Sequence, residues 1–204
     1  MTVFLDALHQ PHVQLLLRLL LGGLLLLAGL SKLAGRESFR AAVAEYKVLP
    51  GAFERPFATV VPWLEVGLGV ALLLGLGMTA AAALAVPLFL SFGIAIGVNI
   101  ARGRAFDCHC FGAVQRDPIG AGALARSLAL AVAALVVAIG TSRFGALEHP
   151  LFGSSASMPS MAEIVPVVFL AALIIDVLVL LPETVAVRHA YAQRQRPQIT
   201  GRAA

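Results

Sequence analysis

Long apolar segments alternate with short polar ones along this chain of 204 residues. About 20 consecutive apolar residues are enough for a helix to cross the hydrocarbon core of a bilayer. Five segments have roughly this length, and they cover residues 13–33, 58–77, 79–100, 119–140 and 162–182. The pattern therefore predicts an all-α fold, a polytopic membrane helical bundle with five transmembrane helices.

Residues 58–100 are too long for a single crossing. As one helix they would measure roughly 65 Å, about twice the thickness of the hydrocarbon core. The chain must therefore reverse within this stretch. The sequence Gly75-Leu76-Gly77-Met78 is the expected turn, because two glycines interrupt the apolar pattern there.

Residues 36–50 are polar enough to leave the hydrocarbon, yet four apolar side chains recur at helical spacing: Phe39, Ala42, Val43 and Tyr46. Such an amphipathic pattern is typical of a short helix that lies on the membrane surface. We expect this helix to end at Pro50-Gly51.

These elements give the domain layout. Residues 1–140 form a membrane core with the first four spans, and residues 141–161 form an irregular extracytoplasmic loop that is rich in Gly, Ser and Pro. A fifth transmembrane helix follows over residues 162–182. Residues 183–204 form a basic cytoplasmic tail.

The composition supports a membrane protein, since 59% of the residues are hydrophobic and only 13% are charged. The net charge of +4 comes from basic residues scattered among acidic ones, without the basic aromatic platform of a nucleic-acid-binding protein. We expect no nucleic-acid partner. The lipid bilayer of the cell membrane is the expected environment.

The distribution of Lys and Arg predicts the orientation. With five spans, thirteen of these residues fall on one side of the membrane, and only Arg18 and Arg143 fall on the other. By the positive-inside rule, the N-terminus is outside. The C-terminus and the loop that contains Cys108 and Cys110 are then cytoplasmic.

The only two cysteines of the chain, Cys108 and Cys110, lie one residue apart in the loop after the third span. A turn at His109 can bring them to the Cα spacing of a disulfide. So small a ring is strained, which favours a transferable disulfide over a structural one. Nearby Arg102 and Arg104, together with His109, favour the reactive thiolate.

Asp107 opposes that effect, and two alternatives to redox chemistry stay open. The thiols can be an inert structural pair, or they can bind a soft metal ion together with His109. No metal site is predicted on this evidence. No cofactor is predicted either, although a quinone and a soft metal ion both stay open.

Ionisable residues within the apolar segments form a second set of candidates. Lys32, Glu65 and Arg126 all fall toward the side of the membrane that carries the cysteines. A charge in hydrocarbon is costly, so such residues normally point into the bundle and pair with one another. We expect Glu65 to pair with Arg126 or with Lys32.

Several motifs together resemble a known family. The segments that carry the likeness are Asn99-Ile100-Ala101-Arg102-Gly103-Arg104, Asp107-Cys108-His109-Cys110-Phe111-Gly112, Gly29-Leu30-Ser31-Lys32-Leu33, Tyr46-Lys47-Val48-Leu49-Pro50 and Pro62-Trp63-Leu64-Glu65. The first two are similar to the hallmark loop of the MauE membrane proteins, which belong to a broader DoxX-like group. The resemblance covers roughly residues 14–140. At position 109 this chain has His where many relatives have Gly.

The resemblance implies a DoxX-like four-helix membrane core. It also implies a role in the maturation of methylamine dehydrogenase, a disulfide-rich protein, alongside a thioredoxin-like partner. In that role Cys108 and Cys110 exchange disulfides, as in a thiol–disulfide oxidoreductase. Two other functions stay open: a non-catalytic membrane assembly or docking factor, and a transporter of a metal or a small solute.

Overall fold

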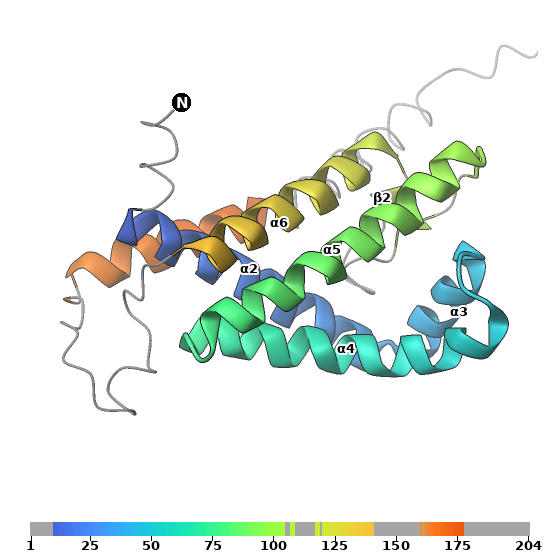
Figure 1. Cartoon of the computed structure of the whole chain (residues 1–204), viewed down its shortest axis with the longest axis horizontal. Coiled ribbons are helices and arrows are strands. Elements are labelled where there is room, and N and C mark those ends of the chain that lie inside the picture. Colours follow the sequence, from blue (N-terminus) through green and yellow to red (C-terminus); the bar gives the residue numbers. More distant parts are fainter. Residues whose placement is uncertain are drawn as a thin grey trace, which may run out of the picture.

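The computed structural model describes residues 10–104, 107–108, 117–118, 120–140, 160 and 162–177. Its labelled elements are α2 (Pro11–Ala34), α3 (Arg36–Tyr46), α4 (Gly51–Leu74), α5 (Met78–Ala101), β1 (Asp107–Cys108), β2 (Asp117–Pro118) and α6 (Ala121–Ile139). Residues 162–177 are also helical. Figure 1 shows the long helices running roughly side by side, with α3 at one end.

Four of these helices, α2, α4, α5 and α6, are long and apolar enough to cross a membrane. Large apolar side chains also remain exposed on the outside of the bundle, among them Val60, Leu84, Ile94, Val132 and Ile139. An apolar outer surface suits contact with lipid chains rather than water. The predicted all-α membrane bundle is confirmed, and its strands are a single antiparallel pair of two residues each within the described part of the chain.

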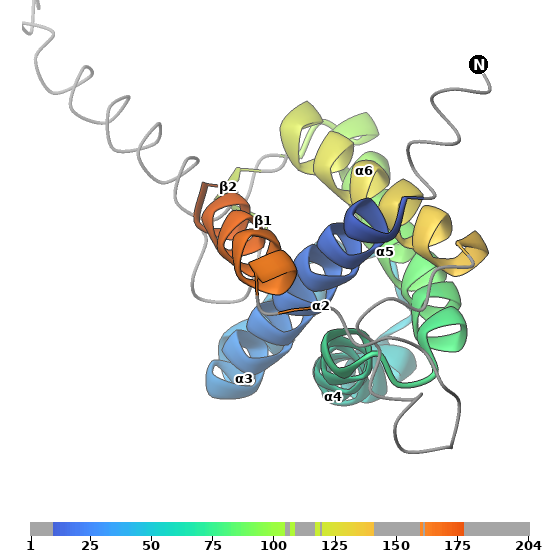
Figure 2. The same cartoon turned by 90° about the vertical axis from the view of Figure 1, so that its left-hand side faces the viewer.

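The helices pack chiefly as two pairs, α2 with α4 and α5 with α6 (Figure 2). Glycines allow the backbones of α2 and α4 to approach closely. A Cβ atom added at Gly29 would lie 2.8 Å from the carbonyl oxygen of Pro62, and one added at Gly69 would lie 2.7 Å from the backbone nitrogen of Leu26. Small residues at an interface are a common means of helix association in membranes.

The reversal between the second and third spans occurs where the sequence predicts it. Gly75 ends α4 with φ 70°, and Gly77 precedes α5 with φ 53°. Both values lie in the left-handed region, which glycine adopts without the steric cost of a Cβ atom. Two left-handed glycines on either side of Leu76 therefore separate α4 from α5.

The second span begins earlier than the predicted residue 58. Helix α4 starts at Gly51, directly after Pro50, and it contains Glu54 and Pro56. The apolar pattern misses this part because its first turns carry charges, which belong at a membrane surface rather than in the hydrocarbon. Glu65 consequently lies about 21 Å along the helix from its first residue, at 1.5 Å per residue.

The amphipathic segment 36–50 forms a shorter helix than predicted, because α3 ends at Tyr46 and Lys47 takes a left-handed conformation with φ 48°. Its apolar residues Phe39, Ala42 and Val43 are buried. They pack against the bundle, chiefly against α4. The helix is therefore part of the fold and covers one end of it.

Residues 162–177 form a helix beside α2 (Figure 2, orange). Ile175 occupies the space above Gly23 and packs near Leu24 and Ala28. The rest of the predicted fifth span, the tail 183–204 and the predicted loop 141–161 apart from Ser160 lie outside the described residues. These parts of the domain layout stay predictions.

Candidate functional site

A buried ion pair joins α2 to α4. The Lys32 ammonium group donates a hydrogen bond to Oε1 of Glu65, and each side chain is only 1% exposed. The close approach of the two helices at Gly29 sets these side chains against each other, since Lys32 lies one turn beyond Gly29 on α2. Of the two partners expected for Glu65, Lys32 makes the contact.

Aromatic rings surround the ammonium group. Its Nζ atom lies 5.3 Å from the ring centroid of Phe39 and 4.9 Å from that of Phe92. Cations within about 6 Å of a ring are attracted by the negative face of the π system. The ion pair and these two rings together replace the hydration that Lys32 gives up on burial.

The second carboxylate oxygen of Glu65 has a different environment. Oε2 is buried and has no hydrogen-bond partner among the described residues. Glu65, Arg126 and Ser127 line a small cavity of about 20 Å³. The other residues that line it are apolar, and its volume leaves room for about one water molecule. Arg126 thus shares a cavity with Glu65, whereas the ion pair itself is with Lys32.

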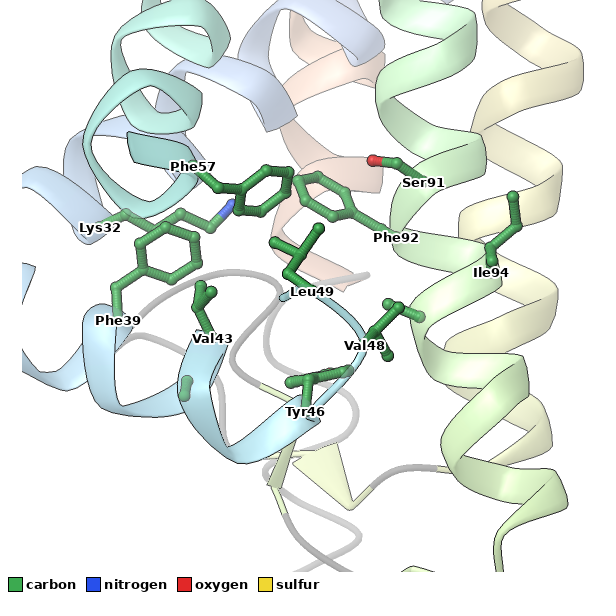
Figure 3. A pocket seen from close by; sticks show the side chains of 12 residues that line it. Lys32, Phe39, Val43, Tyr46, Val48, Leu49, Phe57, Ser91, Phe92 and Ile94 are labelled. Atoms are coloured by element: carbon green, nitrogen blue, oxygen red, sulfur yellow. The ribbon is translucent and has the colours of Figure 1, made fainter. Parts of the chain in front are cut away.

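A larger cavity of about 240 Å³ lies on the Lys32 side of the ion pair. Its walls come from α3, α5, the start of α4 and the segment between α3 and α4. Figure 3 shows the Lys32 amino group pointing into the space between the rings of Phe39 and Phe57, with Phe92 opposite. Apart from this ammonium group, the lining is almost entirely apolar.

Polar side chains from the end of α5 hold the end of α3. The Asn99 side-chain amide donates to the carbonyl of Tyr46 at 3.1 Å, and the Arg104 guanidinium donates to the carbonyl of Glu45 at 2.9 Å. The Arg102 guanidinium donates to the carbonyl of Lys47 at 3.0 Å. The last carbonyls of a helix lack partners within the helix and attract cations. We call Asn99, Arg102 and Arg104 the α3 clamp.

The end of α3 also carries a tyrosine whose ionisation is shifted. Burial raises the pKa of Tyr46 to about 12, and the neighbouring Glu45 carboxylate adds to this rise. The phenol therefore stays neutral at physiological pH and packs partly against Ile96 and Ala123. The guanidinium groups of Arg102 and Arg104, predicted to act on the thiols, donate to backbone carbonyls at the end of α3 and at Lys47, and that of Arg104 also to Asn99.

The base of the cysteine loop lies close to the clamp. Cys108 pairs with Asp117 across the two strands, and Asp107 pairs with Pro118. Asp107 comes three residues after Arg104, so their Cα atoms are at most about 11 Å apart. In Figure 1, β2, α3 and the last turn of α5 lie at the same end of the bundle.

His109 and Cys110 lie outside the described residues, as do the side chains of Asp107 and Cys108. The redox, metal and structural interpretations of the two cysteines therefore stay predictions. Within the part of the chain that is described, no cluster of three His, Cys, Asp or Glu side chains could hold a metal ion.

Two polar residues that sequence reasoning left out of the bundle are buried at its other end. Arg18, assigned by sequence to the far side of the membrane, is 3% exposed, and its guanidinium donates to Sδ of Met78 at 3.1 Å. The Gln14 amide donates to the carbonyl of Val136 at 3.4 Å. Gln14 lies three residues and Arg18 seven residues after the start of α2. This position within the first apolar segment is the signal that could have placed both side chains inside a span.

The three rings around Lys32 were not singled out as a set, because Phe39, Phe57 and Phe92 come from three different segments. Only the helical spacing of Phe39 and its neighbours pointed to one wall of the cavity. Asp176, an acidic residue within the predicted fifth span, is exposed on the helix of residues 162–177. It takes no part in the site.

Comparison with known proteins identifies the family. Residues 10–140 match the family model described as "Methylamine utilisation protein MauE". The methylamine utilization protein MauE of Methylophilus methylotrophus is 37% identical over 135 residues, which are 64% of this chain and 70% of the relative. That of Methylorubrum extorquens is 42% identical over 64% of this chain and 71% of the relative.

A third relative, MauE of Paracoccus denitrificans, is 37% identical over 66% of this chain and 73% of its own length. No solved structure gives a significant match. The region that matches the family model contains the ion pair, the α3 clamp and the cysteine loop. The chain belongs to the MauE family of membrane proteins.

Proposed function

We propose that this protein is an integral membrane component of a thiol–disulfide pathway that supports the maturation of a partner protein. The observation that carries the proposal is the pair Cys108 and Cys110, one residue apart in a loop whose base lies beside the α3 clamp. The names of the relatives add a context, methylamine utilisation. The partner is a protein of that pathway or a thioredoxin-like protein that serves it.

The chemistry requires both sulfurs. A thiolate of one cysteine attacks a disulfide of the partner and forms a mixed disulfide, which releases one partner thiolate. The second cysteine then attacks the mixed disulfide. This protein becomes oxidised to a disulfide while the partner is reduced to a dithiol, and the reverse sequence oxidises the partner. Neighbouring cysteines allow the second step to follow quickly.

The clamp supports this chemistry by fixing the start of the loop. Arg102 and Arg104 each bind a backbone carbonyl at the end of α3. The paired strands join the two ends of the loop at Cys108 and Asp117. A loop anchored at its base presents its central residues at a defined place to a visiting protein.

For the sidedness we propose that the cysteine loop faces the cytoplasm, with the N-terminus outside and the protein in the plasma membrane. The argument is the excess of Lys and Arg on the loop side. Lys32, Arg18 and Arg126 are better left out of this count because they lie within α2 and α6. Leaving them out does not change the direction of the bias.

The decisive experiment replaces Cys108 and Cys110 separately by Ser and measures maturation of the partner in cells. We expect each substitution to abolish maturation, because neither single thiol can complete the exchange. Ala113→Ser is the matched control, since it adds a hydroxyl group to the same loop and leaves both thiols in place. Normal maturation in both cysteine variants contradicts the proposal.

Trapping separates thiol exchange from simple docking. A single-cysteine variant that exchanges disulfides accumulates a mixed disulfide with its partner, visible as a band that reductant removes. A docking factor forms no such bond.

Labelling of Cys108 and Cys110 by a membrane-impermeant thiol reagent, in intact and in opened cells, tests the sidedness. Labelling in intact cells contradicts a cytoplasmic loop.

A further inference from the structure

The cavity of about 240 Å³ beside Lys32 has the features of a ligand site. Three aromatic side chains, Phe39, Phe57 and Phe92, line it together with aliphatic residues (Figure 3). One charged group, the Lys32 ammonium, enters a mostly apolar wall that also includes Ser91 and Tyr46, and Lys32 is 1% exposed. Ligand sites are typically apolar cavities with a few polar groups that fix the ligand's orientation.

Part of the cavity lining reaches the outer surface of α5. Ile94 lines the cavity and is also 62% exposed on the outer surface of α5. Leu90, one turn earlier on α5, is exposed as well. Because this outer surface is apolar and belongs to a membrane-spanning helix, the mouth of the cavity borders the lipid. A lipid-soluble molecule can therefore enter sideways.

The size of the cavity limits what it holds. Sites for drug-sized ligands measure about 300–1,000 Å³, so this cavity is slightly smaller. It accommodates one ring with short substituents, while any longer tail must remain in the mouth or in the lipid. Aromatic walls favour a planar ring, because rings pack on one another in offset or edge-to-face geometry.

The polar group selects the chemistry of that ring. An ammonium group has three N–H donors and no acceptor, and Glu65 takes one of the three. The Glu65 carboxylate also balances the charge of Lys32, so the site does not require an anion. A neutral acceptor such as a ring carbonyl satisfies a further donor. An acyl chain offers no acceptor at all.

We propose that this cavity binds the head group of a membrane quinone, with a ring carbonyl accepting a hydrogen bond from Lys32 and the ring lying among Phe39, Phe57 and Phe92. The apolar tail leaves past Ile94 into the bilayer. Binding at this site does not depend on the cysteines.

A consequence for redox chemistry follows, and it rests on the proposed function. Oxidation of Cys108 and Cys110 to a disulfide releases two electrons and two protons. A quinone accepts both electrons and both protons and becomes a quinol. The bound quinone would then be the oxidant that regenerates the disulfide after each round of exchange with the partner.

The test is photolabelling of the purified full-length protein, in nanodiscs of defined lipid, with a short-chain azidobenzoquinone. We expect saturable labelling of peptides that contain residues 39–49 and 91–95. Decylubiquinone displaces the label, whereas decanol, which has a similar tail and no ring carbonyls, does not. Equal displacement by decanol shows a cavity for acyl chains and overturns the proposal, as does labelling that decylubiquinone leaves unchanged.

Two substitutions on α3 form a matched pair. Ala42→Leu fills the cavity from the buried face of α3, and we expect roughly tenfold weaker quinone binding. Ala41→Leu adds the same atoms on the exposed face and should bind as the unmodified protein does. If both variants bind equally well, the site is wrongly placed.

Two further variants test the polar contact and the independence of the site. The double variant Lys32→Met with Glu65→Leu removes the donor without leaving a charge, so decylubiquinone should lose its advantage over decanol. A persistent advantage contradicts a hydrogen bond from Lys32.

The variant Cys108→Ser with Cys110→Ser should bind quinone normally, because failure of thiol exchange leaves the cavity intact. Loss of binding in it overturns the proposal that the site is independent of the thiols.

Discussion

The two ends of the bundle both bury a basic side chain of α2, and they treat it differently. At one end Lys32 faces a carboxylate, two aromatic rings and a cavity of about 240 Å³. At the other end Arg18 donates to the thioether of Met78, and Gln14 donates to a backbone carbonyl of α6. The Lys32 end therefore combines an ion pair with a cavity, whereas at the Arg18 end the polar side chains contact a thioether and a backbone carbonyl.

This difference indicates where the protein acts. A buried ion pair is costly to desolvate and is weak evidence for stability, so its presence in a membrane helix points to a role beyond folding. The α3 clamp and the base of the cysteine loop lie at the same end as the ion pair.

The largest effect should come from breaking the ion pair. Lys32→Met leaves the Glu65 carboxylate buried without its cation, and such losses cost about 3–5 kcal/mol. The control at the other end is Arg18→Met, which removes the hydrogen bond to the neutral thioether of Met78. For it we expect a smaller change than for Lys32→Met, because the thioether carries no charge. The free energies of unfolding come from SDS titration in mixed micelles.

Two outcomes refine this first prediction. Adding Glu65→Leu to Lys32→Met should recover most of the lost stability, because no buried charge then remains. A single Lys32 variant as stable as the Arg18 variant would show that the two ends are energetically alike. That result would remove the argument that separates them.

The second prediction concerns the close approach that brings Glu65 to Lys32. Gly29→Ala places a Cβ atom 2.8 Å from the carbonyl oxygen of Pro62, and rigid backbone must move, at a cost of about 1–3 kcal/mol. At the other end the atoms nearest to a Cβ atom at Gly140 belong to the side-chain amide of Gln14, which is the end of a flexible side chain rather than backbone. Gly140→Ala should therefore be milder in the same SDS titration.

Gly67→Ala serves as the control within α4, since no atom lies within 4 Å of its added Cβ. It should be neutral or stabilise the helix by about 0.5–1 kcal/mol. If Gly29→Ala is equally harmless, the helices do not depend on close backbone contact at this position.

The third prediction tests the α3 clamp. Arg104→Ala removes the donor to the carbonyls of Glu45 and Tyr46 and to Oδ1 of Asn99. We expect about 1 kcal/mol of lost stability, concentrated as faster hydrogen exchange in α3. Arg40→Ala, which breaks an exposed pair with Glu37, should leave exchange in α3 nearly unchanged. Equal exchange in the two variants would mean that Arg104 does not hold α3.

The smallest effect concerns pH and appears only in alkali. Burial raises the pKa of Tyr46 from 10.0 to about 12, so α3 binds the phenol in its neutral form. This contribution is complete below pH 10 and is lost as the pH rises through about 12, where the folded phenol ionises. Absorbance titration of the phenolate follows this directly.

The chain has two tyrosines, Tyr46 and Tyr191, so the difference between the unmodified protein and Tyr46→Phe isolates one of them. We expect that difference to titrate near pH 12. A midpoint near the ordinary value of 10.0 would show that α3 does not bury its tyrosine.

Much of the fold can be predicted from the sequence, because a bilayer requires long apolar segments and satisfied backbone groups. The turn at Gly75 and Gly77 is an example, since glycine readily adopts the left-handed conformations found there. The start of α4 at Gly51 could not be predicted from the apolar pattern. Its first turns are charged, and hydropathy detects the part of a helix within the lipid rather than the whole helix.

The candidate site was also predictable only in part. Lys32 and Glu65 were predicted from their cost in hydrocarbon, and their pairing was one of two alternatives. The choice between Lys32 and Arg126 needed the structure, because it depends on how closely α2 approaches α4. The roles of Cys108 and Cys110 stay predictions, because their side chains lie outside the described residues.

By itself, the sequence determined that this is an all-α membrane protein with an intramembrane charge pair and one loop with two cysteines. These features follow from residue type and spacing along the chain. Only the tertiary structure decided that three phenylalanines from separate segments surround Lys32, and that Arg102 and Arg104 hold the end of α3. Such contacts depend on how closely the helices pack against one another, and the local pattern of a single segment does not determine these distances.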